Sequence, residues 1–439
     1  MKVSILKGIC LLSVLSILIG STACGSQGTA GIGGASAPAP SAAPEIKSIS
    51  IWHIWTSDTD SNKVSFEAAA KSFAAGNPDI KLEVEAIETE IYKSKIRLAI
   101  ATNEAPDVFF SWGGGFSKPF VDSGKVLEVY SYLDADTKSR LMESALGSQT
   151  YDGKIYGLPF MVSVICLFAN REMFEQYEIN LPETYEDLLT AVRSFRVEGI
   201  TPATVAEIEL WPGMLWYDAL ALRTAGLETS MAALEKRATF DQPAFIEAAD
   251  KLDELVDAGM FQKNYMKTGY AEAMEPVRQG RVPMILMGSW ACSGFEDDTS
   301  AVKGKMVPLK FPLVPGGKST LDEYIGGAID CWMVSAGASD RAASVKTAAG
   351  IAEGLCKEGY ERNMLIPVWD VAVDESKISP LMRQIEETVK DARGFVPSWD
   401  TFLEGPDAQT HLKLVAGLLA QSVAPEEFGT RMQEINKGN

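Results

Sequence analysis

The pattern of apolar and polar positions predicts alternating strands and helices in the first part of the folded chain. Residues 48–55 are apolar and β-prone, and apolar residues recur at helical spacing through residues 62–75. Across residues 80–86, apolar residues alternate with charged ones, which indicates a half-buried strand. A second helical pattern and the apolar run 108–110 follow. This alternation predicts a parallel sheet that helices cover on both faces.

Further helices and strands are predicted along the rest of the chain. Residues 184–187 form a helix start of the capping-box type. We expect Asp241 to cap a later helix and Gly259 to end it. Residues 281–287 read as a buried strand, and residues 325–334 read as another single apolar strand.

The first residues of the chain have the pattern of a secretion signal. A basic start precedes an apolar run over residues 8–20, which is short for a bilayer-spanning helix, and small residues follow it directly before Cys24. The order resembles a bacterial lipoprotein signal, although Ser21 stands where that signal favours Leu. We expect a signal peptide over residues 1–23 and lipid on Cys24; an ordinary secretion signal with a chance cysteine is the alternative.

Residues 24–44 contain mainly Gly, Ala, Ser and Pro after the cysteine, which predicts a flexible tether. A lipid at one end of a tether places the protein on the outer face of the cell membrane, either extracellular or periplasmic. The membrane is therefore expected to be a partner only through this anchor.

The charge and the cysteines exclude several classes of partner and site. Residues 24–439 carry 38 Lys+Arg against 59 Asp+Glu, a formal net charge of −21, which disfavours nucleic acid and anionic lipid. Cys166, Cys292, Cys331 and Cys356 form no CxxC pair, so no zinc or redox motif is expected. The first three lie in apolar runs and are predicted to be buried free thiols. No cofactor and no metal site is predicted.

Several segments follow one another in the order typical of a known family. They include GNPDIKLEVE (76–85), APDVFFSWGGG (105–115), YDGKIYGLPF (151–160), LPETYEDLL (181–189), GRVPMILMGSW (280–290), FPLVPGG (311–317) and IGGAID (325–330). With these segments the chain resembles the extracellular solute-binding proteins, family 1, of carbohydrate ABC importers, in their lipoprotein form. The match is less distinct after Ala338.

The resemblance implies an α/β fold of the periplasmic-binding-protein type II. Two hinged lobes, each a mainly parallel sheet flanked by helices, would hold a solute in the cleft between them. We expect chain crossings near residues 158–163, near residues 311–317 and after Asp374. Lobe one would then comprise residues 45–160 and 318–378, and lobe two residues 161–317 and 379–439.

The function that the resemblance implies is capture of a sugar or oligosaccharide and its delivery to the permease subunits of an ABC transporter. The protein would be a monomer and not an enzyme. A pyranose presents an apolar C–H face and a rim of hydroxyls, which suit indole rings and carboxylates respectively.

Candidate ligand-binding residues lie mainly at strand ends and beside glycines. The strand ends supply Trp55, Asp58, Trp112 with Gly113, and Trp290. The resemblance adds Trp211 and Trp399 from lobe two, while Asp330 and Ser163 are candidate hydroxyl partners. Three other tryptophans, Trp52, Trp216 and Trp332, lie in apolar periodic runs and are predicted to be core residues.

Two other functions fit parts of the sequence. A cell-surface glycosidase would need two carboxylates about 5–9 Å apart, and the many Asp and Glu residues permit such a pair. However, no GxSxG, HExxH or GxxxxGK[ST] motif is present, and residues 24–439 hold only two histidines. The same fold with a peptide or polyamine as ligand is the other alternative, because aromatic and acidic residues also bind amines.

Overall fold

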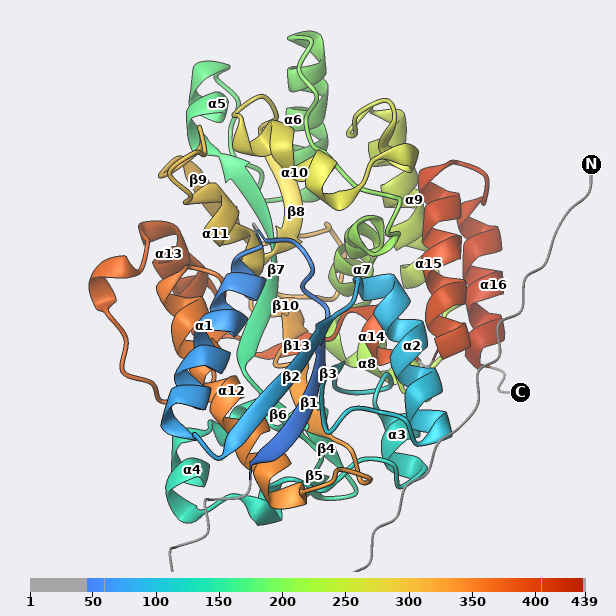
Figure 1. Cartoon of the computed structure of the whole chain (residues 1–439). Helices are drawn as coiled ribbons and strands as arrows, with labels where there is room; N and C mark the ends of the chain where they lie inside the picture. The colour runs from blue at the N-terminus through green and yellow to red at the C-terminus, as the bar shows by residue number, and fades with distance from the viewer. Residues whose placement is uncertain (1–45, 59, 404, 437–439) are drawn as a thin grey trace, which may run out of the picture. The chain divides into compact units, whose positions relative to one another are not determined.

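The computed structural model describes residues 46–58, 60–403 and 405–436, and two mixed sheets organise this part of the chain (Figure 1). The first sheet has the order β2-β1-β3-β11-β6. Its strands are β1 Lys47–His53, β2 Ile80–Ala86, β3 Val108–Trp112, β6 Gly157–Pro159 and β11 Asp330–Val334. β1 pairs in parallel with β2 and β3, whereas β11 runs antiparallel to β3 and β6.

The helices of the first lobe pack around this sheet. They are α1 Ser61–Gly76, α2 Thr89–Thr102, α3 Lys118–Asp122, α4 Ala135–Arg140 and α12 Arg341–Glu361. α1 packs along α12, and α12 also contacts β11 (Figure 1). A small hairpin of β4 Thr150–Tyr151 and β5 Lys154–Ile155 lies in the same lobe. We call this sheet and these helices lobe one.

The second sheet is built around the long strand β7. Its strands are β7 Met161–Asn170, β8 Met284–Gly288, β9 Met306–Leu309, β10 Glu323–Gly327, β12 Ile366–Pro367 and β13 Gly394–Val396. β7 is antiparallel to β8, β9, β10 and β12, and only the β10–β13 pair of this sheet is parallel. We call this sheet and the helices around it lobe two.

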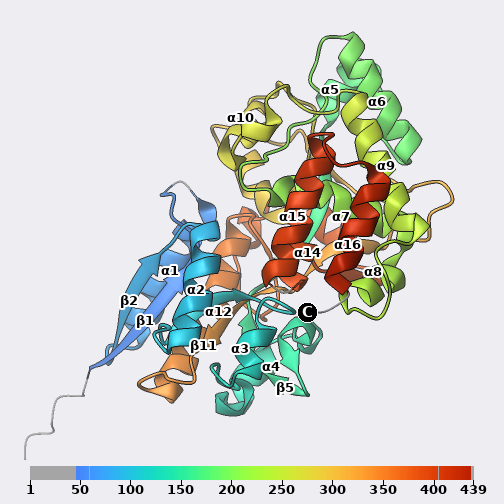
Figure 2. The same ribbon diagram turned by 90° about the vertical axis from the view of Figure 1, so that its right-hand side faces the viewer.

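Lobe two contains most of the remaining helices, which gather in the upper right of Figure 2. They are α5 Arg171–Gln176, α6 Tyr185–Val197, α7 Trp211–Ala225, α8 Leu227–Leu234, α9 Pro243–Asp257, α10 Tyr270–Arg278, α11 Cys292–Phe295, α13 Pro380–Val389, α14 Trp399–Phe402, α15 Gly405–Leu419 and α16 Pro425–Asn436. One-turn 3-10 helices occupy Tyr130–Tyr132, Glu143–Ala145, Gly147–Gln149, Tyr265–Lys267, Ser289–Ala291 and Glu375–Lys377. α7 is buried over nearly its whole length, with α9 and α15 packed against it.

The two-lobed α/β class is confirmed, but the mainly parallel pairing is wrong for lobe two. The predicted βαβ alternation of residues 48–110 gives the parallel pairs of lobe one. In lobe two, β8 and β9 return to β7 after long helical segments and pair with it in the opposite direction. A local apolar pattern does not specify the direction of such distant partners.

The strand predicted over residues 325–334 is in fact two strands in different sheets. β10 ends at Gly327 in lobe two, and β11 begins at Asp330 in lobe one. Gly326 and Gly327 have φ values of 135° and 112°, which only glycine adopts without strain. The chain therefore passes between the sheets at residues 328–329. The expected position of that crossing, residues 311–317, would place β10 in the wrong sheet.

The other sequence predictions for this part of the chain mostly hold. Thr184 and Asp187 form the predicted capping box, but Asp241 does not cap α9. Gln242 occupies the N-cap position there, and Pro243 begins the helix with its φ already fixed. The four cysteines of the described residues are buried and free, as predicted for three of them.

The N-terminal predictions lie outside the described residues. They are the signal peptide, the lipid on Cys24 and the tether. Within residues 46–436, no described helix combines the length and the apolar character needed to cross a bilayer.

Candidate functional site

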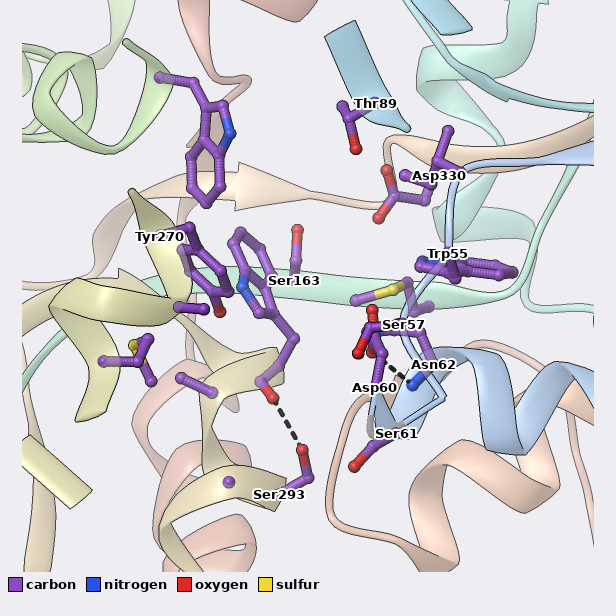
Figure 3. A pocket seen from close by; sticks show the side chains of 18 of the residues that line it. Trp55, Ser57, Asp60, Ser61, Asn62, Thr89, Ser163, Tyr270, Ser293 and Asp330 are labelled. Atoms are coloured by element: carbon purple, nitrogen blue, oxygen red, sulfur yellow. Dashed lines mark hydrogen bonds between the residues drawn. The ribbon is translucent and has the colours of Figure 1, made fainter. Parts of the chain in front are cut away.

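A cavity of about 780 Å³ lies between the two lobes. Figure 3 shows Trp55, Asp60, Asn62, Thr89 and Asp330 of lobe one on one side, facing Tyr270 and Ser293 of lobe two. Ser163 of β7 lies between these two sets. The cavity is therefore lined by both lobes, and a ligand inside it would contact both.

The lobe-one wall forms where three parallel strands end. Trp55 follows β1, Thr89 begins the helix after β2, and Trp112 is the last residue of β3. Asp60 caps α1, and its carboxylate accepts hydrogen bonds from the Asn62 backbone N–H at 2.8 Å and the Asn62 side chain at 2.9 Å. Adjacent parallel strands bring their carboxyl ends to the same sheet edge, which gathers these side chains.

The lobe-two wall is aromatic. Trp211 begins α7, Tyr270 begins α10 and Trp290 follows β8. The Trp211 ring centroid is 5.5 Å from that of Tyr270 and 6.2 Å from that of Trp290. All three side chains are partly exposed and line the cavity. Such rings offer rigid apolar surfaces that lose little entropy when a ligand stacks on them.

Asp330 contributes a carboxylate to the cavity lining. It begins β11, directly after the residues where the chain crosses between lobes. Burial raises its pKa to about 7. Among the described residues, no hydrogen bond or ion pair to its carboxylate is found, so its lone pairs remain available inside the cavity (Figure 3).

We expect Asp330→Asn to stabilise the ligand-free protein at pH 8. The native pKa is raised above the unfolded value, so this group's ionisation lowers the free energy of unfolding as pH rises from about 4 to 7. Three pKa units represent roughly 4 kcal/mol. Because water reaches part of the residue through the cleft, we expect a gain of about 1–3 kcal/mol at pH 8 and almost none at pH 4.

Urea titrations of the ligand-free protein at both pH values measure this gain. The matched control is Asp58→Asn, whose exposed carboxylate pairs with Lys63, so that the pKa of Asp58 is lowered by the Lys63 hydrogen bond and charge. Its removal should give no stabilisation at pH 8. A loss of stability in Asp330→Asn at pH 8 would contradict the raised pKa.

One end of the cavity holds a buried ion pair between the α2 helix and the α14 helix. Lys93 Nζ lies 2.9 Å from Glu90 Oε1 and 3.1 Å from Asp400 Oδ2, and 5.4 Å from the Trp112 ring centroid. Lys93 and Asp400 are each 6% exposed. Burial opposes the charge on Lys93, but the carboxylates of Asp400 and Glu90 still raise its pKa. The pair therefore ties lobe one to a C-terminal segment packed in lobe two.

The structure brings six of the predicted ligand-binding residues to the cavity. These are Trp55, Trp112, Ser163, Trp211, Trp290 and Asp330. Trp216 and Trp332 are fully buried, as predicted for core residues. Among the described residues, no group of three or more His, Cys, Asp or Glu side chains is arranged to hold a metal ion.

Three predicted site residues do not line the cavity. Asp58 points to solvent, with its side chain 92% exposed. A Cβ on Gly113 would lie 2.3 Å from the Ser148 carbonyl oxygen, so this glycine permits close backbone packing. Trp399 is fully buried and stacks on His411 at 5.0 Å between ring centroids. Proximity to a proline or a strand end does not reveal such burial.

The sequence reasoning missed several polar residues of the cavity. They include Asp60, Asn62, Thr89, Lys93, Tyr270, Glu275, Arg278, Ser293, Asp297 and Asp400. Asp60, Thr89 and Tyr270 lie at or beside helix N-termini, and the helices of Asp60 and Thr89 follow predicted strands. A polar residue at a predicted strand-to-helix turn could therefore have been recognised from the sequence as a candidate cavity residue. Arg278 and Asp400 had no comparable signal in the sequence.

Two α/β lobes with an aromatic and polar cavity between them define the class of two-domain ligand-binding receptors. Residues 57–350 match the family model of the bacterial extracellular solute-binding proteins. The chain belongs to this family, whose members bind solutes and are not enzymes.

Related proteins agree with this class. A structure solved in a study of xylan utilization by the thermophilic bacterium Caldanaerobius polysaccharolyticus is 38% identical, with a TM-score of 0.86 over 90% of this chain and 100% of that one. A chitin oligosaccharide binding protein shares the fold, with 23% identity and a TM-score of 0.80 over 89% and 98% of the two chains. The melibiose/raffinose/stachyose-binding protein MelE of Bacillus subtilis is 24% identical over 67% of each chain. The chain spans 57–65% of the length of several other curated relatives that it matches.

Proposed function

We propose that the protein is a receptor that binds a sugar or oligosaccharide in the interlobe cavity and delivers it to the permease of an ABC transporter. The two lobes would close on the ligand about the chain crossings, and the receptor would act as a monomer. The structure related at 38% identity comes from work on xylan utilization, which makes short xylo-oligosaccharides the first ligands to test.

The observation that carries this proposal is that lobe two lines the cavity with aromatic rings, whereas lobe one lines it with polar groups. Trp211, Tyr270 and Trp290 offer stacking surfaces from lobe two, whereas Asp330 and Asn62 offer polar groups from lobe one. A sugar ring needs both, because its C–H face is apolar and its edge carries hydroxyls. Hydrogen bonds to charged groups contribute about 1.5–3 kcal/mol each, so a few of them with one or two stacked rings can reach the roughly −8 kcal/mol of micromolar binding.

Calorimetric titration with xylotriose, chitotriose and raffinose tests the proposal. We expect saturable binding of xylotriose with a dissociation constant in the micromolar range, and a higher melting temperature of the complex by mass action. Cleavage of the saccharide would favour the enzyme alternative. Binding of a polyamine or peptide panel, together with no binding of any saccharide, would replace the proposed ligand class.

The N-terminal segment supports a further expectation about location. If Cys24 carries a lipid, Cys24→Ala should move the protein from the membrane fraction to the soluble fraction, because a tether alone has no membrane affinity. Immunoblots of the two fractions measure this. Ser21→Leu is a useful comparison, since it restores the preferred lipoprotein signal and should retain the membrane fraction. Retention of the Cys24→Ala protein in membranes would contradict the anchor.

A further inference from the structure

The cavity carries more negative than positive side chains. Among the described residues, five carboxylates line it: Asp60, Glu275, Asp297, Asp330 and Asp400. Its lining cations are Lys93 and Arg278. The formal balance of this lining is therefore −3, in a chain whose own net charge is −19. A ligand entering the cavity meets a negative field from both the wall and the whole molecule.

Both lining cations already pair with carboxylates of the protein. Lys93 is already held by two carboxylates, as described above. Arg278 lies between Glu275 and Asp297, with guanidinium nitrogens 3.4 Å and 3.6 Å from their respective oxygens. Its Nε also donates to the Gly294 carbonyl oxygen at 3.0 Å. Recruiting either cation to a ligand would leave protein carboxylates without their partner.

Among the described residues, Asp330 differs from the other lining carboxylates because neither a cation nor a hydrogen-bond donor pairs with it. Asp400 is paired with Lys93, and Glu275 and Asp297 share Arg278. Asp60 receives two hydrogen bonds at the start of α1. The carboxylate of Asp330 instead faces the cavity beside Thr89, with no partner drawn or found among the described residues (Figure 3).

We propose that the cavity selects against saccharides that carry a carboxylate, and that Asp330 is the residue that sets this selectivity. The inference rests on the proposed function and makes the substrate class more specific: neutral oligosaccharides are taken, and uronate-bearing ones are excluded. Asp330 accepts hydrogen bonds from neutral hydroxyls but repels a second carboxylate. At about 8 Å and an effective dielectric constant near 20, repulsion between two unit charges corresponds to more than tenfold in affinity. Asp330 can take up a proton instead, and because its pKa is about 7, this limits the effect at pH 8 to about tenfold.

The test compares a uronate with its own ester. The ligands are xylotriose, a xylotriose that carries one glucuronate branch, and the methyl ester of that branched sugar, all titrated at pH 8 by calorimetry. The acid and its ester have nearly the same shape and differ by one charge. We expect xylotriose and the ester to bind, and the acid to bind about fivefold to tenfold more weakly than the ester.

Two variants assign the effect to Asp330. In Asp330→Asn the preference for the ester over the acid should fall to about threefold or less. Asp58→Asn removes the same charge from an exposed side chain outside the cavity lining, and its preference should equal that of the unaltered protein. Comparing a ratio of affinities within each variant removes any general loss of binding that the substitution causes.

Each outcome decides between the proposals. Equal affinity for the acid and the ester would overturn the charge selectivity. If neither branched sugar binds, the charge selectivity is also overturned, because the shape of the branch would then exclude both ligands. An ester preference that persists in Asp330→Asn would overturn the role of this residue. Failure of xylotriose itself would count against the proposed ligand class, and tight binding of the acid alone would overturn the inference while leaving saccharide binding intact.

Discussion

Replacing Trp290 by Ala is expected to weaken oligosaccharide binding about 30-fold. The indole is partly exposed, lines the cavity and lies 6.2 Å from the Trp211 ring, so its removal opens the aromatic wall. Loss of a stacked aromatic anchor typically costs about 2 kcal/mol of binding free energy, which corresponds to that factor. Trp290→Phe should recover part of the loss, because a smaller ring still stacks. Calorimetry with the preferred saccharide measures both variants.

Trp52 offers a matched control for this substitution. It is also partly buried and lies on β1, but it does not line the cavity, and Lys95 Nζ covers its ring at 4.1 Å. Trp52→Ala should change the affinity less than twofold. Trp112 is a poorer test, because it is 8% exposed and packs against Phe110 and Phe116. Unchanged affinity in Trp290→Ala would remove this residue from the binding site.

Replacing Lys93 by Met is expected to lower the free energy of unfolding by about 3–5 kcal/mol. The substitution leaves Asp400 buried at 6% exposure without the cation that lies 3.1 Å away. Removing one partner of a buried pair costs this much because an uncompensated charge remains in the interior. The loss should appear in urea unfolding of the ligand-free protein at pH 8.

Two further variants show whether charge causes the loss. The double variant Lys93→Met with Asp400→Leu removes both charges and should regain most of the stability, since apolar replacement of a buried pair is often neutral. Lys81→Met removes a lysine 2.9 Å from Glu83 at the surface, where both side chains are more than half exposed. It should cost less than about 1 kcal/mol. A double variant as unstable as the single one would point to lost packing instead.

Local sequence patterns predicted some of the cavity residues and misplaced others. Trp55 and Trp112 were found from sequence because both follow apolar strands, and parallel strands end at a common edge. Trp399 seemed equivalent in sequence, yet it is buried against His411 of α15 and the rings of Tyr217 in α7 and Phe245 in α9. Both kinds of tryptophan stand beside similar neighbours, so only the packing of distant segments separates a cavity wall from a core residue.

Polar residues were harder to predict than aromatic ones for the same reason. Lys93 and Asp400 are 307 positions apart in the chain, and nothing in either segment indicates that they form a buried pair. Asp330 was predicted as a candidate hydroxyl partner after two glycines, within a single strand over residues 325–334. What the sequence did not show is that these glycines carry the chain from one sheet to the other, and thereby place Asp330 in the cavity without a partner.

The sequence by itself determined the α/β class, the strands and helices of lobe one up to β3, the buried free cysteines and the segments typical of the family. These features depend on periodicity and on short motifs, which are local properties of the chain. The tertiary structure alone decided the antiparallel pairing in lobe two, the crossing at residues 328–329 and the charge balance of the cavity. These three features depend on contacts between segments that are far apart in the chain. The residues of one segment alone do not determine the free energy of such contacts.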